Sequence, residues 1–149
     1  MYKNMDISFW NKVLYIDESK FNLFKSGGQS YVWRKPNEEL KEKNLKATVN
    51  HGGGSVLVWG CMSSSEVGEL CIIDGIMDQT KYLSILKQNL VPSVEKLGIK
   101  DTFQFYQDND PKHKAHAVSM WLLYNCPHVL ETPPQSPDIN VIEHLWAHL

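Results

Sequence analysis

The order of segments in the sequence predicts an α/β fold, with a mixed central sheet of about five strands flanked by helices. Short runs rich in β-branched and aromatic residues come first, and such runs are typical of strands. Later segments carry apolar residues three and four positions apart, which is typical of helices. Three or more antiparallel strands, followed by helix, strand, helix, strand and helix, indicate a sheet covered by helices. A chain of 149 residues has the length of one domain, so we expect residues 1–149 to form a single domain.

The first predicted elements are strands. Residues 13–17 form an apolar run that predicts a buried strand ending in an acidic segment. The composition of residues 26–30 predicts a turn, and residues 31–33 begin a second strand that is able to form a hairpin with the first. Residues 56–62 are the clearest strand of the sequence, and residues 69–73 are predicted to lie beside it across a Ser/Gly-rich turn.

A charged stretch at residues 36–50 interrupts these strands. It mixes Glu and Lys without an apolar stripe, which favours a solvated loop over an arm that contacts DNA. The glycines of residues 51–55 then predict a turn into the next strand.

Helices and strands alternate after this point. Asp78 or Thr80 is placed to cap a helix that runs through residues 82–94, although Pro92 interrupts its pattern. Residues 102–106 alternate as a strand that leads into an acidic loop.

A second helical pattern begins at Pro111 and extends through residues 118–123. Residues 128–130 form a short strand, and residues 132–137 form an extended connection. Residues 138–149 resume a helical pattern, which completes the predicted fold.

Composition limits where the protein acts and how it contacts nucleic acid. The net charge is −2 and only one Arg, Arg34, is present, so we expect little base-specific readout of DNA by this chain. Cys61, Cys71 and Cys126 are odd in number and lie in or beside apolar runs, which favours reduced thiols in a reducing, intracellular compartment. No segment resembles a secretory signal or a membrane span.

Three carboxylates are candidates for a metal-dependent site. Asp17 and Asp108 close separate predicted strands, and Glu143 lies in the last predicted helix. Phosphoryl transfer by two divalent ions requires carboxylates that hold the ions about 4 Å apart. Mg²⁺ prefers such hard oxygen ligands, so these residue types suit that chemistry.

Four blocks of sequence carry more specific motifs. They are residues 17–22 (Asp-Glu-Ser-Lys-Phe-Asn), residues 51–60 (His-Gly-Gly-Gly-Ser-Val-Leu-Val-Trp-Gly), residues 107–113 (Gln-Asp-Asn-Asp-Pro-Lys-His) and residues 133–140 (Pro-Pro-Gln-Ser-Pro-Asp-Ile-Asn). Between Asp108 and Glu143 lie 34 residues. Together the blocks and the spacing resemble the catalytic domain of Tc1/mariner-type DNA transposases, and the resemblance covers almost the whole chain.

The resemblance implies an RNase H-like fold and cut-and-paste transposition. In this chemistry water cleaves the transposon ends, and the freed 3′-hydroxyl then attacks target DNA. Asp17, Asp108 and Glu143 are by the same resemblance the catalytic residues and the ligands of Mg²⁺ or Mn²⁺. The implied partners are the DNA of transposon ends and target, with a homodimer or an intact transposase subunit, in the nucleus. The acidic neighbours Glu18, Asp110 and Asp138 receive no catalytic role.

The transposases that this chain resembles begin with a helix-turn-helix region that reads the inverted repeats, and we expect that region to be absent here. This expectation leaves a second hypothesis open, in which the chain is a catalytically silent remnant that binds DNA or a transposase subunit. Hydrolysis of RNA is a third and weaker hypothesis.

Several residues admit alternative interpretations. Asp110 is the main rival to Asp108, although a capping role before Pro111 explains it. Lys112 and its neighbours to residue 116 are placed either to contact a DNA backbone or simply to be solvated. The tryptophans are expected to pack in the core rather than to stack on bases.

Two other kinds of site are disfavoured. Histidines at helical spacing, residues 113 and 116 or 144 and 148, lack a third zinc ligand. The glycine run at residues 51–54 resembles an esterase loop, but no G-x-S-x-G motif supplies a nucleophile.

Overall fold

A computed structural model describes residues 2, 4–23, 54–131 and 139–149. The chain divides into two compact units, one made of residues 1–19 with 57–149 and the other of residues 20–56. The second unit is described only near its two ends, where the Leu23 N–H donates to the carbonyl of Gly54 (3.0 Å). The strand predicted at residues 31–33, the charged stretch at 36–50 and the connection at 132–137 lie outside the described residues.

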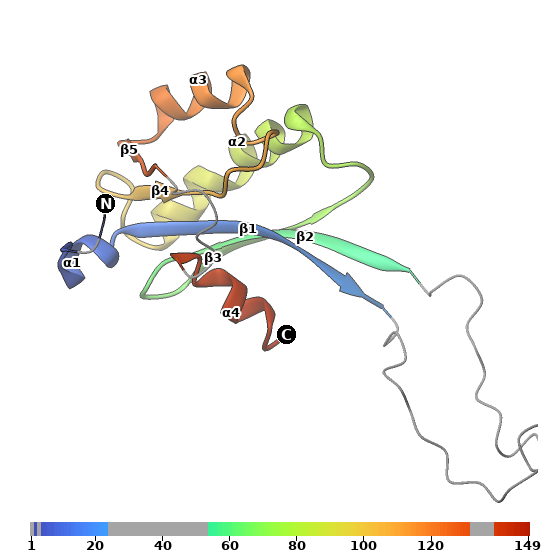
Figure 1. Ribbon diagram of the computed structural model, residues 1–149, viewed down its shortest axis with the longest axis horizontal. Helices are drawn as coiled ribbons and strands as arrows, with labels where there is room; N and C mark the ends of the chain where they lie inside the picture. Colours follow the sequence, from blue (N-terminus) through green and yellow to red (C-terminus); the bar gives the residue numbers. More distant parts are fainter. Residues whose placement is uncertain (1, 3, 24–53, 132–138) are drawn as a thin grey trace, which may run out of the picture. The chain divides into compact units, whose positions relative to one another are not determined.

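The described residues form a five-stranded mixed sheet, as the sequence predicts, and its strand order is β3-β2-β1-β4-β5 (Figure 1). β2 and β3 are antiparallel, whereas β4 is parallel to both β1 and β5. The strands are β1 (Val13–Asn22), β2 (Ser55–Met62), β3 (Val67–Ile73), β4 (Gln104–Tyr106) and β5 (His128–Val129).

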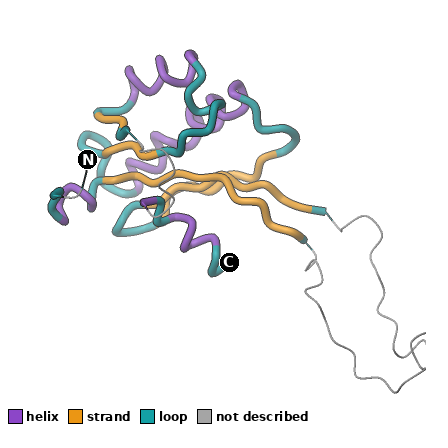
Figure 2. The backbone as a smooth tube through the Cα atoms, in the orientation of Figure 1, coloured by secondary structure: helices purple, strands orange, loops and turns teal. Residues whose placement is uncertain are grey.

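Helices cover both faces of this sheet (Figure 2). They are α1 (Ile7–Trp10), α2 (Gln79–Lys96), α3 (His116–Asn125) and α4 (Ile142–Trp146). α2 and α3 lie on one face, called here the α2 face, and α4 lies on the other, called the α4 face (Figure 1). No helix within the described residues has both the length and the apolarity needed to cross a bilayer.

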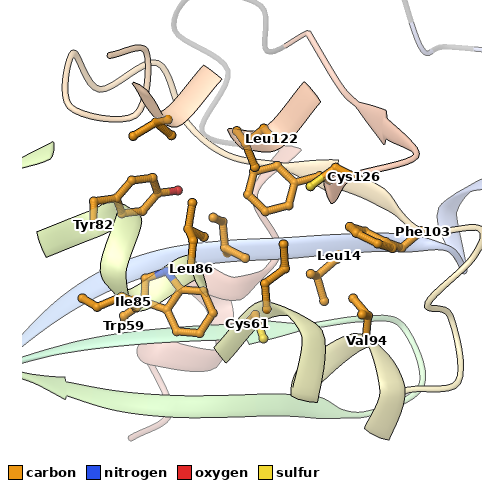
Figure 3. Close-up of a cluster of buried hydrophobic side chains, with 14 of the residues drawn as sticks. Leu14, Trp59, Cys61, Tyr82, Ile85, Leu86, Val94, Phe103, Leu122 and Cys126 are labelled. Carbon is orange, nitrogen blue, oxygen red and sulfur yellow. The ribbon is translucent and has the colours of Figure 1, made fainter. Parts of the chain in front are cut away.

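The larger core fills the α2 face (Figure 3). Side chains of β1, β2 and β4 meet α2 and α3 there, and its fully buried members include Leu14, Trp59, Tyr82, Leu86 and Phe105. Alternate residues of β1 and β4 point the other way, because successive side chains of a strand face opposite sides. They form a smaller core on the α4 face, made of Val13, Tyr15, Tyr106 and Ile142.

Helix α2 follows the prediction closely. The Asp78 side chain accepts the N–H of Lys81 (2.8 Å), so Asp78 rather than Thr80 is the N-cap. The helix continues through Pro92 without a break.

Three element boundaries predicted from the sequence are wrong. β1 does not end at Asp17 but runs on to Asn22, because half-exposed polar residues are compatible with a strand that has one solvated face. The second helical pattern does not begin at Pro111, because residues 111–114 form turns and α3 starts at His116. The last helix is shorter than residues 138–149 and spans Ile142–Trp146.

Candidate active site

Asp17 and Asp108 come together through the pairing of β1 with β4. Leu14 is level with Phe105, and Tyr15 is level with Tyr106, in parallel register. Continuing that offset for two more residues makes Asp17 level with Asp108. Neighbouring strands lie about 4.8 Å apart, so Asp17, in the middle of β1, and Asp108, two residues beyond the end of β4, belong to one site.

The Asp17 carboxylate faces α4. Its position alternates with that of Tyr15, which belongs to the core of the α4 face. Its Oδ2 atom accepts the indole N–H of Trp146 (3.1 Å), a residue of α4. Trp146 thus ties the last helix to the middle of β1.

Burial raises the pKa of Asp17 to about 6, and the negative charges of Glu18 and Asp108 add to the increase. The hydrogen bond from Trp146 acts in the opposite direction because it favours the charged form. The pKa of Asp17 is therefore raised because this carboxylate is partly removed from water and lies beside other carboxylates.

Asp108 has different surroundings, and its side chain is 52% exposed. Its Oδ1 atom contacts Nδ1 of His113 (2.5 Å) and accepts the backbone N–H of Asp110 (3.1 Å). The hydrogen bond with His113 is the main reason why the pKa of Asp108 is lowered. Among the described residues, nothing hydrogen-bonds to Oδ2 of Asp108.

A second carboxylate, Glu18, anchors the other side of His113. Its side chain is 10% exposed, and its Oε1 atom lies 3.2 Å from Nε2 of His113. These two atoms form an ion pair without forming a hydrogen bond. Lys112 Nζ lies 3.4 Å from Glu18 and 2.6 Å from Asp110.

His113 is enclosed by these groups and is only 2% exposed. Its ring stacks on Tyr82 of α2, with ring centroids 4.0 Å apart. Burial by itself would lower the pKa of His113, but the contacts with Asp108 and Glu18 outweigh it and raise the pKa to about 9.

Asp108 lies close enough for its charge to raise the pKa of Asp17, whereas no described contact joins Glu143 to either aspartate. Glu143 is exposed on α4, one turn before Trp146. Within the described residues, no group of three His, Cys, Asp or Glu side chains is close enough to hold a metal ion. The described site therefore consists of Asp17 and Asp108, with Glu143 on the helix that Trp146 fixes to Asp17.

Comparison with known protein families identifies the family of this chain. A family model described as DDE superfamily endonuclease matches residues 12–149. The chain belongs to the DDE superfamily of endonucleases. This result confirms the Tc1/mariner resemblance inferred from the sequence motifs.

Known transposases are similar over most of this DDE domain. The Tc1 transposase of Caenorhabditis elegans is 45% identical over 141 residues, which are 94% of this chain and 51% of the relative. The Tc3 transposase of the same organism is 34% identical over 140 residues, which are 94% of this chain and 41% of the relative. The chain thus spans about half the length of the curated relatives it matches, or somewhat less.

Solved structures of the Mos1 transposase share the fold. A Mos1 mariner paired-end complex with Mn has a TM-score of 0.74 at 23% identity, covering 99% of this chain and 43% of that one. The Mos1 catalytic domain has a TM-score of 0.65 at 19% identity, covering 99% and 61%. The DDE domain therefore has the RNase H-like fold that the resemblance implied.

The structure also corrects the role expected for Asp110. The N-cap residue of α3 is Ala115, and no side chain caps this helix, so Asp110 is not a helix cap. Asp110 instead accepts the backbone N–H of Lys112 (2.9 Å) and closes the turn after Asp108.

Three residues around the candidate site are not assigned to it by the sequence. The sequence analysis gives Glu18 no catalytic role, leaves His113 either solvated or in contact with DNA, and expects Trp146 to pack in the core. The usable signal for Trp146 was its spacing of three from Glu143, which puts both on one side of a helix. No comparable signal existed for His113, because residues 111–114 follow no helical or strand period.

Proposed function

We propose that this chain binds Mg²⁺ or Mn²⁺ through Asp17 and Asp108, with Glu143 as a third ligand, and catalyses DNA cleavage and strand transfer. The observation that carries the proposal is the parallel pairing of β1 with β4, which brings Asp17 of β1 beside Asp108, two residues beyond the end of β4. Membership of the DDE endonuclease superfamily supports the same chemistry.

The two aspartates fit a divalent cation. Both offer hard carboxylate oxygens, and Mg²⁺ is commonly held by one or two carboxylates together with substrate phosphates. The Oδ2 atom of Asp108 makes no hydrogen bond within the described part of the chain, and so is available to a ligand. A divalent cation there supplies activation of the attacking oxygen and stabilisation of the leaving oxygen.

The protein contributes the placement of these ligands. The pairing of β1 with β4 sets the distance between the two aspartates, and Trp146 holds α4 beside Asp17. Because Glu143 lies on the same short helix, the docking of α4 also determines where this third carboxylate stands.

DNA is the proposed substrate, as transposon ends and as target. Solved structures of Mos1 are described as a paired-end complex with the left transposon end and as a strand transfer complex, and others contain Mg or Mn. By analogy we include in the proposal a second transposase subunit as partner and the nucleus as location. This chain's charge of −2 makes a metal ion an important part of its contact with phosphate.

The test is Mn²⁺-dependent nicking and strand transfer by the purified chain on duplex DNA. Asp17→Asn and Asp108→Asn should each abolish activity, since the amide keeps the shape of the side chain but removes a charged ligand. Asp101→Asn is the matched control, because Asp101 is an exposed aspartate just before β4, and it should leave activity unchanged.

Glu143→Gln tests the third ligand and should also abolish activity. If Glu143→Gln alone remains active, the site works with two carboxylates and Glu143 has another role. An intact chain that folds but never cuts DNA would contradict the proposed catalysis and would favour a silent DNA-binding or subunit-binding remnant.

A further inference from the structure

His113 has no part in the chemistry described above, yet its side chain is only 2% exposed, whereas that of Asp108 is 52% exposed. Both ring nitrogens contact carboxylates, Nδ1 meeting Asp108 and Nε2 meeting Glu18. One face of the ring lies against Tyr82. The ring of His113 is therefore contacted on three sides.

The support of His113 extends into the core. Its carbonyl accepts the side-chain amide of Gln107 (3.3 Å), and Gln107 in turn accepts the hydroxyl of Tyr82 (2.8 Å). Tyr82 is fully buried on α2. The backbone and the ring of His113 are therefore both attached to the helix that packs on the main core.

This arrangement limits how Asp108 can move. A carboxylate has no hydrogen to donate, so Nδ1 of His113 donates to Oδ1 of Asp108. The backbone N–H of Asp110 donates to the same oxygen. Two donors from different directions fix the carboxylate plane and leave Oδ2 as the oxygen that faces a ligand.

On the basis of the proposed function, we propose that His113 is a positioning residue that orients Asp108 for the metal. The functional contact is Nδ1 with Asp108, and the contact of Nε2 with Glu18 holds the ring in that orientation. Groups of this kind, one step removed from a metal, typically change metal affinity by about 10-fold to 100-fold when they are removed.

Substitutions of His113 can test the roles of its two ring nitrogens separately. Asn places its amide nitrogen near the position of Nδ1, so His113→Asn keeps a donor for Asp108 and loses the contact with Glu18. Gln reaches the position of Nε2, so His113→Gln keeps the contact with Glu18 and loses the donor for Asp108. His113→Phe keeps the ring on Tyr82 and removes both nitrogens.

Mn²⁺ binding to the purified chain is the readout, measured as loss of the free-ion signal in electron paramagnetic resonance. We expect His113→Gln and His113→Phe to bind Mn²⁺ about 10-fold to 100-fold more weakly and His113→Asn to bind it nearly as well as the original chain. His116→Phe is the matched control, because His116 is exposed at the start of α3. Circular dichroism and thermal unfolding establish that each variant is folded.

Two results would overturn the positioning role. Equal losses in His113→Asn and His113→Gln would indicate that the histidine only supports the fold. Unchanged or tighter binding by His113→Phe would indicate that His113 competes with the metal for Asp108. If His113→Phe does not fold, the comparison of the Asn and Gln variants decides the question.

Failure of the proposed function has a different signature. In that case the original chain binds no Mn²⁺, or Asp108→Asn binds it as well as the original chain does. Binding that is lost in Asp108→Asn but kept in His113→Gln contradicts the positioning role alone.

Discussion

The two aspartates of the site have opposite pKa shifts although the pairing of β1 with β4 brings them side by side. Burial is the main cause of the raised pKa of Asp17, whereas the hydrogen bond from His113 is the main cause of the lowered pKa of Asp108. The difference arises from which residues surround each carboxylate rather than from strand position. Single side chains such as Trp146 and His113 therefore control the properties of the site.

The hydrogen bond from Trp146 to Asp17 should be measurable as a coupling free energy. Trp146→Phe removes the indole N–H and keeps an aromatic ring, while Asp17→Ala removes the acceptor. In a double-mutant cycle followed by urea unfolding, we expect a coupling of about 1.5–3 kcal/mol, because hydrogen bonds to charged groups lie in this range. Additive effects of the two substitutions would contradict the contact.

The thiol of Cys126 gives a prediction about pH. Burial raises its pKa to about 12, so the folded protein keeps this thiol protonated where an unfolded thiol, with a pKa near 8.5, already ionises. The stabilisation is complete below the unfolded pKa and is lost as pH rises toward about 12. Cys126→Ala should therefore weaken the fall in stability above about pH 9.

Alkylation by iodoacetamide checks the same thiol directly. At pH 8 we expect the partly exposed Cys71 to react in the folded protein, while the buried Cys61 and Cys126 react only after urea is added. Mass spectrometry of the digested protein distinguishes the three sites. Equal labelling of Cys71 and Cys126 in the folded state would contradict the assigned burial.

At the scale of elements, the sequence predicted the strands and the long helix well because each has a strong local signal. Residues 56–62 and 69–73 are rich in apolar and β-branched residues and form β2 and β3, and Asp78 is an N-cap by residue type. The same reasoning missed α1, which has only four residues, Ile7–Trp10. Local periodicity identifies an element when the element is long enough to show a period.

The start of α3 shows why some boundaries could not be predicted. Residues 111–114 are held by tertiary contacts, with His113 between Asp108 and Glu18 and Lys112 bound to Asp110. These contacts join residues from different parts of the chain, so no local sequence pattern predicts them. The same reason explains why Asp17 and Asp108 were recognised from motifs, whereas His113 was not placed in the site.

The docking of α4 on β2 depends on the absence of a side chain at Gly60. A Cβ at this position would lie 2.6 Å from Cη2 of Trp146, too close for the ring to remain in place. We expect Gly60→Ala to destabilise the fold by about 1–3 kcal/mol and to weaken DNA cleavage, because the helix that carries Glu143 must shift. Urea unfolding and nicking assays measure the two effects.

The control for this prediction is the same substitution in a Trp146→Leu background. Leu is smaller than Trp, so the additional loss of stability from Gly60→Ala should largely disappear there. A loss of the same size in both backgrounds would indicate strain in β2 itself rather than a clash with α4.

At the scale of the molecule, the candidate site is a cluster of acidic groups. Four carboxylates, those of Asp17, Glu18, Asp108 and Asp110, lie there with two cationic groups among the described residues, Lys112 and the imidazolium of His113. The cluster therefore carries a charge of about −2 when His113 is protonated, which is the charge that one divalent cation neutralises. The folded state should bind such a cation, whereas the unfolded chain has no assembled site.

Metal binding should accordingly stabilise the whole fold. At a concentration of Mn²⁺ 100 times the dissociation constant, linkage gives about 2.7 kcal/mol, or a rise in Tm of roughly 5–10 °C for a domain of this size. Thermal unfolding with Mn²⁺, compared with NaCl at equal ionic strength, measures the effect. The double variant Asp17→Asn, Asp108→Asn should unfold at the same temperature in both solutions. An equal rise in the double variant would mean that Mn²⁺ stabilises the fold without Asp17 and Asp108, because neither of these residues then offers a charged ligand.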